Sequence, residues 1–269
     1  MLFPDHLCLL RGGGDLATGT ALRLHRAGFP VVVCELEHPL TVRRTVAVST
    51  ALTDSSGVTT VEGMTARRVD RLEELATEAA TGAVPVIICP DLPPPDVVPR
   101  SVVIDARLLK RNPDTSLDDA PLVVALGPGY SAGRDCHVVV ETLRGPDLGR
   151  VILDGPAAAD TGTPGEVSGR VAERVLRSPV DGKARWIRQI GDRVSTGELL
   201  GYVGSAPVLA ALDGVVRGLV SEGTPLVANT KVGDIDPRCE VSVDRVSDKA
   251  LAVGGGVLEA VLAWIDRST

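Results

Sequence analysis

The chain has 269 residues, of which 44% are hydrophobic and 23% charged, which is enough apolar sequence for two domains with cores of their own. A formal net charge of −7 argues against a nucleic-acid partner, and an aromatic content of 2% leaves few side chains on which bases could stack. No stretch reaches the roughly 20 apolar residues of a membrane helix, and the first strand pattern follows no secretory leader. We therefore expect a cytoplasmic protein with no membrane partner.

The five cysteines are odd in number and widely separated, which favours reduced thiols over disulfides and predicts no metal site. Three of them fall in apolar strand patterns, where cysteine usually packs as a small buried hydrophobe. These three are Cys8, Cys34 and Cys89, and the other two are Cys136 and Cys239.

The most informative segment is 7–35, LCLLRGGGDLATGTALRLHRAGFPVVVCE, which has the pattern of a strand, a glycine-rich turn, a helix and a second strand. Gly12, Gly14 and Ala17 occupy the three small-residue positions of a dinucleotide-binding loop, where glycine permits a tight turn and close approach of a pyrophosphate. Glu35 ends the second strand about 20 residues further on, where a carboxylate can accept hydrogen bonds from a ribose 2′-hydroxyl. The pattern predicts NAD or another nucleotide with an unmodified ribose as cofactor.

Three further residues complete the predicted cofactor-binding loop. Gly13 lies between the other two glycines, and Arg11 adds a donor at the strand end. Asp15 brings negative charge that would oppose a pyrophosphate, unless it pairs with Arg11 or a metal or caps the following helix. Because similar turns occur in doubly wound proteins that bind no nucleotide, a purely structural loop is the alternative interpretation.

Strand and helix patterns continue to alternate as far as residue 112, as expected for a mostly parallel sheet flanked by helices. The small and turn-forming residues of 154–169 then form the best candidate for a linker. We therefore predict a Rossmann-like, doubly wound α/β domain over residues 1–160.

Polar groups gather where this domain's later strands end. Asp105, Lys110 and Asn112 follow the strand pattern at 101–106, at a position where doubly wound sheets carry ligand-handling groups. They are candidate catalytic residues.

A second glycine-rich loop follows the strand that begins at Leu122. Gly127, Gly129 and Gly133 supply backbone amides that could form an anion nest beside Arg134. We expect this loop to line the same cleft as the first one, with Gly127 and Gly129 contributing to cofactor binding.

Asp135, His137 and Glu141 have a spacing that would place all three on one face of a strand. Such a set could act in acid–base chemistry or hold a metal, and the alternative is a hydrogen-bonded structural histidine. Arg43 and Arg44 lie beyond the second strand, where they could reach a ligand phosphate or simply be solvated.

An internal repeat follows the linker, because residues 178–203 align with residues 210–235. Each half carries an Asp-Gly turn, an apolar strand, a second glycine turn and another strand. Two such halves resemble the biotinyl/lipoyl carrier fold, a β-rich barrel-sandwich, which we predict over 170–240. Carriers present a lysine in the hairpin between the halves. Here that hairpin is Gly204-Ser205-Ala206-Pro207, so we predict no biotin or lipoyl group and favour a docking module. Residues 241–269 are expected to form a helix that packs on the body.

Taken together, these segments resemble the YqeB-type family of selenium-dependent molybdenum hydroxylase accessory proteins, which is related to the XdhC/CoxF maturation factors. The resemblance covers nearly the full length and rests on LRGGGDLATGTALRLHRAGFPVVVCELEHPLTVRRTVAVSTAL, VEG at 61–63, IDARLLKRN, ALGPGYSAGRDCHVVVETLRGPDLGRVI, DTGTPG and RVLRSPVDG. The chain departs from the family pattern at Pro146, where a histidine is expected.

The resemblance implies a maturation factor that binds a nucleotide, or the dinucleotide form of molybdenum cofactor, and delivers it to a molybdenum hydroxylase apo-enzyme. The alternative is an NAD-dependent oxidoreductase, although the sequence shows no clear acid–base pair for hydride transfer. The sequence does not decide whether the protein is an enzyme or whether it forms a homo-oligomer.

Overall fold

The computed structural model describes residues 1–162, 169–170, 172–238 and 240–268, so part of the predicted linker and Cys239 lie outside the described residues. The chain divides into two compact units, and neither is continuous in sequence. The first unit comprises Met1–Glu37, Val48–Asp160 and Val246–Thr269, and the second comprises His38–Ala47 and Thr161–Arg245. The predicted first domain of 1–160 therefore lacks 38–47, and the C-terminal segment returns to the first unit only from Val246.

The first unit is built on a nine-stranded sheet in the order β10-β9-β7-β6-β1-β2-β5-β4-β3. Its strands are parallel except at the two ends, where β3 pairs with β4 and β10 with β9 in antiparallel register. The strands are β1 (Cys8–Arg11), β2 (Val31–Glu35), β3 (Val58–Val61), β4 (Met64–Arg68), β5 (Val84–Ile88), β6 (Val102–Asp105), β7 (Leu122–Leu126), β9 (Val138–Val140) and β10 (Val151–Ile152).

The central strands are continuous apolar runs rather than alternating patterns. Every residue of β1, β6, β7 and β9 is buried, as expected for parallel strands that are covered on both faces. The coarse prediction of a mixed α/β protein with a mostly parallel sheet is confirmed.

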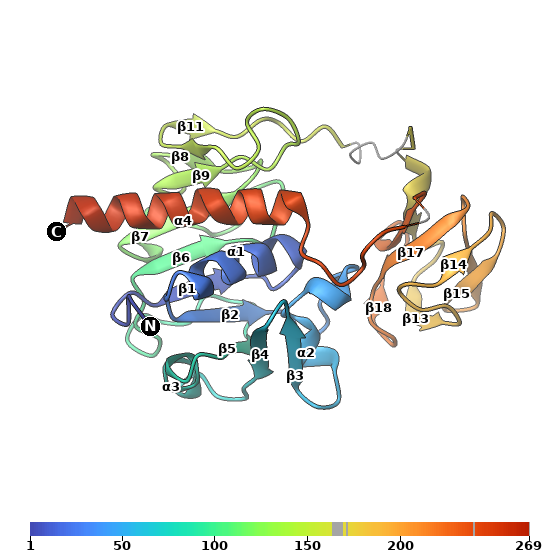
Figure 1. Ribbon diagram of the computed structural model, residues 1–269, viewed down its shortest axis with the longest axis horizontal. Helices are drawn as coiled ribbons and strands as arrows, with labels where there is room; N and C mark the ends of the chain where they lie inside the picture. Colours follow the sequence, from blue (N-terminus) through green and yellow to red (C-terminus); the bar gives the residue numbers. More distant parts are fainter. Residues whose placement is uncertain (163–168, 171, 239, 269) are drawn as a thin grey trace. The chain divides into compact units, whose positions relative to one another are not determined.

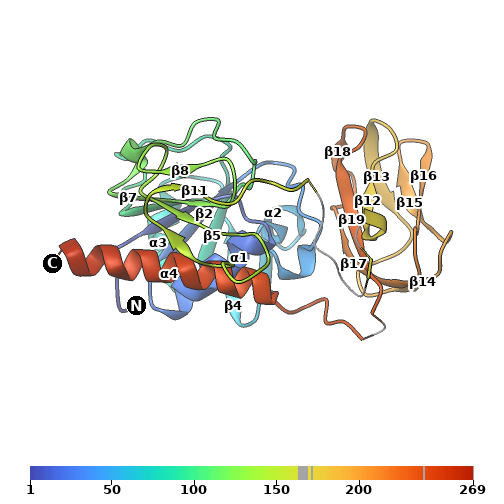
Figure 2. The same ribbon diagram turned by 90° about the horizontal axis from the view of Figure 1, so that it is seen from above.

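Helices and a small second sheet cover the two faces. On one face α1 (Asp15–Arg26) packs along α4 (Asp248–Ser268), which also contacts β7, β9 and β10 (Figures 1 and 2). On the other face α3 (Glu74–Ala80) buries Leu75 and Ala79 against Leu9 and Val32 of the central strands. The remaining elements of this unit are α2 (Thr50–Thr53), the 3-10 helix η2 (Leu117–Asp119) and a two-stranded sheet of β8 (Ser131–Ala132) and β11 (Gly155–Pro156).

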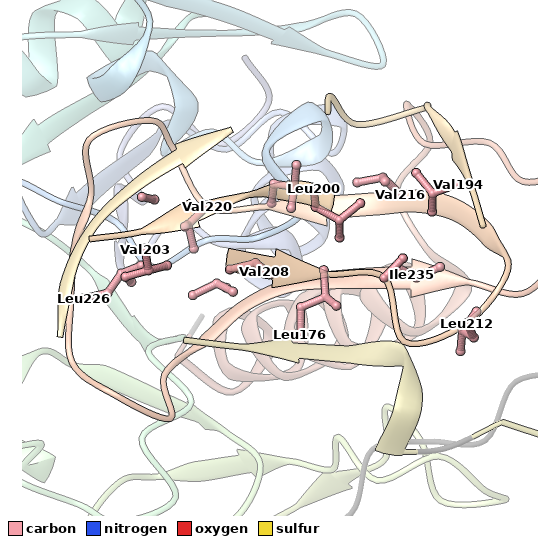
Figure 3. Packing of buried hydrophobic residues seen from close by; sticks show 14 residues of the cluster. Leu176, Val194, Leu200, Val203, Val208, Leu212, Val216, Val220, Leu226 and Ile235 are labelled. Carbon is pink, nitrogen blue, oxygen red and sulfur yellow. The ribbon is translucent and has the colours of Figure 1, made fainter. Parts of the chain in front are cut away.

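The second unit consists of two four-stranded antiparallel sheets, ordered β12-β19-β17-β14 and β16-β15-β13-β18. Both sheets contribute to one apolar core, in which Leu200 and Val203 lie with Val216 and Ile235 (Figure 3). The strands are β12 (Val175–Arg177), β13 (Gly182–Trp186), β14 (Arg193–Val194), β15 (Leu199–Val203), β16 (Ala206–Leu209), β17 (Gly214–Leu219), β18 (Pro225–Leu226) and β19 (Lys231–Asp236), and two 3-10 helices are η1 (Arg44–Val46) and η3 (Ala172–Arg174).

The internal repeat is visible in the strand pairing of this unit. The first half contributes β13, β14 and β15, and the second contributes β17, β18 and β19 in the same order. The two halves exchange their short middle strands, because β14 pairs with β17 and β18 pairs with β13. Neither half could therefore form its sheet alone. In the part of the chain that the structure describes, no helix is long and apolar enough to cross a membrane.

Candidate functional site

The first glycine-rich loop follows the end of β1, and its backbone conformation depends on glycine at one position. Gly12 has a φ of +99°, and a Cβ there would lie 3.2 Å from the carbonyl carbon of Ala106, so a side chain would be strained and crowded. Gly14 is the N-cap of α1 with a φ of −68°, and its carbonyl accepts hydrogen bonds from the amide and hydroxyl of Thr18, both at 2.8 Å. Only Gly12 therefore needs glycine for its backbone conformation.

Glu35 is attached to this loop from the neighbouring strand. Its Oε2 accepts a hydrogen bond from the amide of Gly13 at 2.7 Å, and its Oε1 accepts one from the amide of Leu36 at 2.7 Å. Burial raises the pKa of Glu35 above its ordinary value, and the two amide hydrogen bonds only partly oppose this. The predicted contact between Glu35 and a ribose stays a prediction, and the structure adds a role in fixing the loop.

Arg11 does not pair with Asp15. Its buried guanidinium makes two hydrogen bonds to the Asp114 carboxylate, at 3.0 and 2.7 Å. Arg107 also contacts Asp114, at 2.6 Å. These cations lower the pKa of Asp114 to about 2, chiefly through the hydrogen bond from Arg11. Arg11 is thus held in an ion-pair network, and Asp15 is the first residue of α1 rather than its cap.

Asp105 forms the buried centre of the same network. Its carboxylate accepts hydrogen bonds from Arg107 at 2.6 Å, from the Tyr130 hydroxyl at 2.9 Å and from the Thr115 hydroxyl at 2.5 Å. Burial alone would raise the pKa of Asp105, but the bonds from Arg107 and Thr115 outweigh burial and hold it below its ordinary value. A carboxylate with no exposed surface and this many partners is suited to fixing the loops around it rather than to exchanging a proton with a ligand.

The two other candidates after β6 also have intramolecular partners. Lys110 lies 2.9 Å from the carboxylate of Asp160 and has a φ of +62°. The Asn112 side chain accepts hydrogen bonds from the amides of Asp114 and Thr115 and donates one to the Thr115 carbonyl at 2.8 Å. Asn112 therefore shapes the loop that carries Asp114.

The second glycine-rich loop lies at the same edge of the sheet as the first, because β1, β6 and β7 are parallel neighbours in that order. Gly127 and Gly129 both have positive φ, of +76° and +101°. The amide of Gly127 donates to the carbonyl of Val140 at 2.9 Å, so it is not available to an anion nest. Tyr130, which the sequence analysis did not single out, extends from this loop to Asp105.

The prediction that Asp135, His137 and Glu141 share one strand face is wrong. The strand β9 is only Val138–Val140, so all three residues lie outside it. The Asp135 carboxylate accepts from the amide of Ser131 at 2.8 Å and pairs with Arg134 at 2.9 Å.

His137 and Glu141 also satisfy the backbone. His137 accepts the amide of Val123 on Nδ1 at 3.0 Å, and burial lowers its pKa. Glu141 is buried and accepts three amides at 2.7 Å, those of Thr142, Leu143 and Ala158. Among the residues that the structure describes, no group of three or more His, Cys, Asp or Glu side chains could hold a metal ion.

Lys249, in the first turn of α4, is a basic residue at this edge that sequence reasoning missed. Burial lowers its pKa, and so does the charge of Arg144, whereas Asp15, Glu141 and Asp248 oppose the shift. The interaction with Asp15 places Lys249 near the start of α1. No local pattern could have indicated this, because the lysine lies at the opposite end of the chain.

Arg43 and Arg44 belong to the second unit and have structural contacts there. Arg43 donates to the carbonyl of Arg245 at 3.1 Å, and Arg44 donates to the carbonyl of Leu219 at 2.7 Å. These contacts attach segment 38–47 to the second unit, so the two arginines are not simply solvated, and their contact with a ligand phosphate stays a prediction.

Fold and site together define a mixed α/β protein with a glycine-rich loop at the carboxyl edge of a mostly parallel sheet, followed in the chain by a unit of two small antiparallel sheets. The chain is a homologue of the protein named "Uncharacterized protein YqeB" from Escherichia coli (strain K12), with 44% identity over 268 residues. The match covers 97% of this chain and 49% of the relative, so the chain spans about half the length of the curated relative it matches. No family model matches the chain.

Two solved structures show only remote similarity. The succinylglutamatedesuccinylase/aspartoacylase from Rhodobacter sphaeroides has 22% identity and a TM-score of 0.23 over 32% of this chain and 29% of that one. An aspartoacylase family protein from Mesorhizobium loti has 10% identity and a TM-score of 0.25 over 88% of this chain and 87% of that one.

Proposed function

We propose that the loop Gly12–Gly14 and the first turn of α1 bind the pyrophosphate of a nucleotide with an unmodified ribose. The observation that carries the proposal is the strand order β5-β2-β1-β6-β7-β9, in which β2 and β5 lie on one side of β1 and the later strands β6, β7 and β9 lie on the other, so that the chain changes sides at β1; β3 and β4 form the outer edge beyond β5. Open α/β sheets bind their ligands at the carboxyl ends of the strands where this reversal occurs, and the Rossmann-like fold has the same order. Here the reversal falls between β1 and β6.

The chemistry of the edge is compatible with such a ligand. The amides at the start of a helix attract anions through their partial positive charge, and the N-cap of α1 carries no side chain that would occupy them. Lys249 adds positive charge near Asp15, which would otherwise repel a phosphate. Glu35 supplies an acceptor for ribose hydroxyls next to the loop.

We further propose that the protein is a maturation factor that binds the dinucleotide form of molybdenum cofactor, or a related nucleotide, for a molybdenum hydroxylase apo-enzyme. The support for this step is the sequence resemblance described above. The second unit, with its exchanged repeat, suits a barrel-sandwich docking module. The turn between β15 and β16 consists of Gly204 and Ser205, which offers no lysine for biotin or lipoyl attachment.

Gly14→Val tests the nucleotide site, because φ at Gly14 suits any residue while a valine side chain would occupy the path of the pyrophosphate. Calorimetry with NAD, NADP, ADP, CDP and GDP should show binding to the wild type and at least a tenfold loss in Gly14→Val. Gly255→Val is the matched control, since a Cβ at Gly255 meets no atom within 4 Å. Absence of binding to the wild type at millimolar ligand would contradict the proposal.

Native mass spectrometry of the protein purified from its own host tests the identity of the ligand. A bound pterin dinucleotide is the expected result. Bound NAD without a pterin would instead favour the NAD-dependent oxidoreductase, and an added mass of biotin or lipoyl would overturn the assignment of the second unit.

A further inference from the structure

Two cysteines from different strands meet beside the glycine-rich loop. Cys34 is the penultimate residue of β2, and Cys89 directly follows β5. The two strands are parallel, with Cys34 opposite Ile87, so Cys89 lies two residues further along the same face. Both side chains belong to one apolar cluster, in which the two sulfur atoms interact, and the Cys89 thiol donates a hydrogen bond to the carbonyl of Asp91 at 3.1 Å.

The two thiols differ in access and environment. Cys34 is only 4% exposed, whereas Cys89 is half-buried and open to small reagents. The interaction with the Cys34 thiol lowers the pKa of Cys89, and the Arg11 guanidinium lowers it further, while partial burial and the Asp91 carboxylate act in the opposite direction. The pKa of Cys34 is raised by its interaction with Cys89 and by burial, despite Arg11 and Arg100. Cys89 is therefore the thiol suited to react first.

The remaining described cysteines differ from this pair in their surroundings. Cys8 and Cys136 are fully buried, and burial raises the pKa of each thiol. Cys8 is opposite Val31 in the β1–β2 register, which places its side chain on the sheet face away from Cys34. They serve as internal controls for reactivity.

We propose that Cys34 and Cys89 form a redox-active dithiol that exchanges with small-molecule disulfides. The Cys89 thiolate attacks one sulfur of the disulfide RSSR, which forms Cys89–S–SR and releases RS⁻. The Cys34 thiolate then attacks the Cys89 sulfur, which forms the Cys34–Cys89 bond and releases the second RS⁻. One RSSR is reduced to two thiols, and the two protons come from the cysteines.

The register of the strands makes this disulfide a reversible one. Because the two residues are offset by two positions, closing the bond requires Cys89, at the end of β5, to move toward β2. A bond formed under such strain is easily reduced, unlike a structural disulfide, which resists the glutathione pool.

The test treats the full-length wild type with glutathione disulfide, blocks free thiols by alkylation and maps the peptides. We expect a Cys34–Cys89 crosslink that excess reduced glutathione reopens, with Cys8 and Cys136 alkylated only after denaturation. In Cys34→Ala, Cys89 should retain glutathione as a stable mixed disulfide, and in Cys89→Ala, Cys34 should stay unmodified. A lasting glutathione adduct on Cys89 in the wild type, or no reaction at either residue, would overturn the proposal.

A second reagent avoids both variants and any movement of the backbone. Phenylarsine oxide binds two adjacent thiols through one arsenic atom with loss of water, so it should protect Cys34 and Cys89 together from alkylation of the unfolded chain. Protection of neither, or of Cys89 alone, would show that the two thiols do not act as a pair.

Discussion

The two strands that flank β1 each carry a carboxylate at the carboxyl edge of the sheet, and the protein surrounds the two carboxylates differently. Glu35, at the end of β2, accepts only backbone amides and has a raised pKa. Asp105, at the end of β6, accepts from Arg107, Thr115 and Tyr130 and has a lowered pKa. The presence of a guanidinium partner therefore decides whether burial or pairing controls each pKa.

This difference separates two roles at the same edge. Asp105 has its acceptor capacity committed to side chains that fix the loops after β6 and β7. Glu35 holds Gly13 with one oxygen and Leu36 with the other, and it retains lone pairs that a ribose hydroxyl could use. Of the two, Glu35 is the one suited to meet a ligand.

The largest effect is expected for Asp105→Ala, because it leaves a guanidinium and two hydroxyls without their buried carboxylate. Removing one partner of a buried ion pair typically destabilises a protein by about 3–5 kcal/mol. Urea unfolding followed by circular dichroism measures the change, with the exposed Asp96→Ala as the matched control. A loss no greater than in the control would mean that Asp105 does not fix the loops.

A smaller effect is expected for Glu35→Ala, which removes two amide hydrogen bonds at a half-buried position. Loss of these bonds should cost about 1–3 kcal/mol of unfolding free energy. The exposed Glu37→Ala, two residues away, is the control. If Glu35→Ala destabilised the protein as much as Asp105→Ala, the contrast between the two carboxylates would fail.

The sequence predicted the strand, loop, helix and strand of residues 7–35, because each of those patterns is local. It did not predict the partners of Asp105, since Arg107 and Thr115 reach it only through a loop in which Leu108 and Lys110 adopt positive φ. A side-chain network of this kind depends on a backbone path that hydrophobic periodicity does not specify.

The other features that the sequence did not predict have similar physical causes. Spacing placed Asp135 and Glu141 on one strand face, but the strand has only three residues. Asp135 instead accepts the amide of Ser131 in β8, and Glu141 accepts the amide of Thr142 in the loop after β9. Contacts between segments that are distant in the sequence decide two further features. They pair β14 with β17 and β18 with β13, and they make 38–47 part of the second unit. An apolar strand pattern is compatible with Cys34 and Cys89 either as isolated buried residues or as a neighbouring pair. Their proximity could therefore not be predicted without the register of β2 and β5.

The smallest predicted effect concerns acid stability and the outer end of the Asp105 network. The pKa of Asp114 is about 2 in the folded protein against an ordinary value of 3.8, because Arg11 and Arg107 stabilise its charged form. As the pH falls, the unfolded chain binds this proton first, so the stabilisation is complete above about pH 4 and is lost toward pH 2. The Asp114 side chain is 45% exposed, so solvent screening keeps the effect small.

Asp114→Asn should therefore show a shallower loss of unfolding free energy than the wild type between pH 4 and pH 2. Parallel acid-unfolding curves for the two proteins would show that the Arg11–Asp114 pair contributes nothing to stability and that the network ends at Arg107.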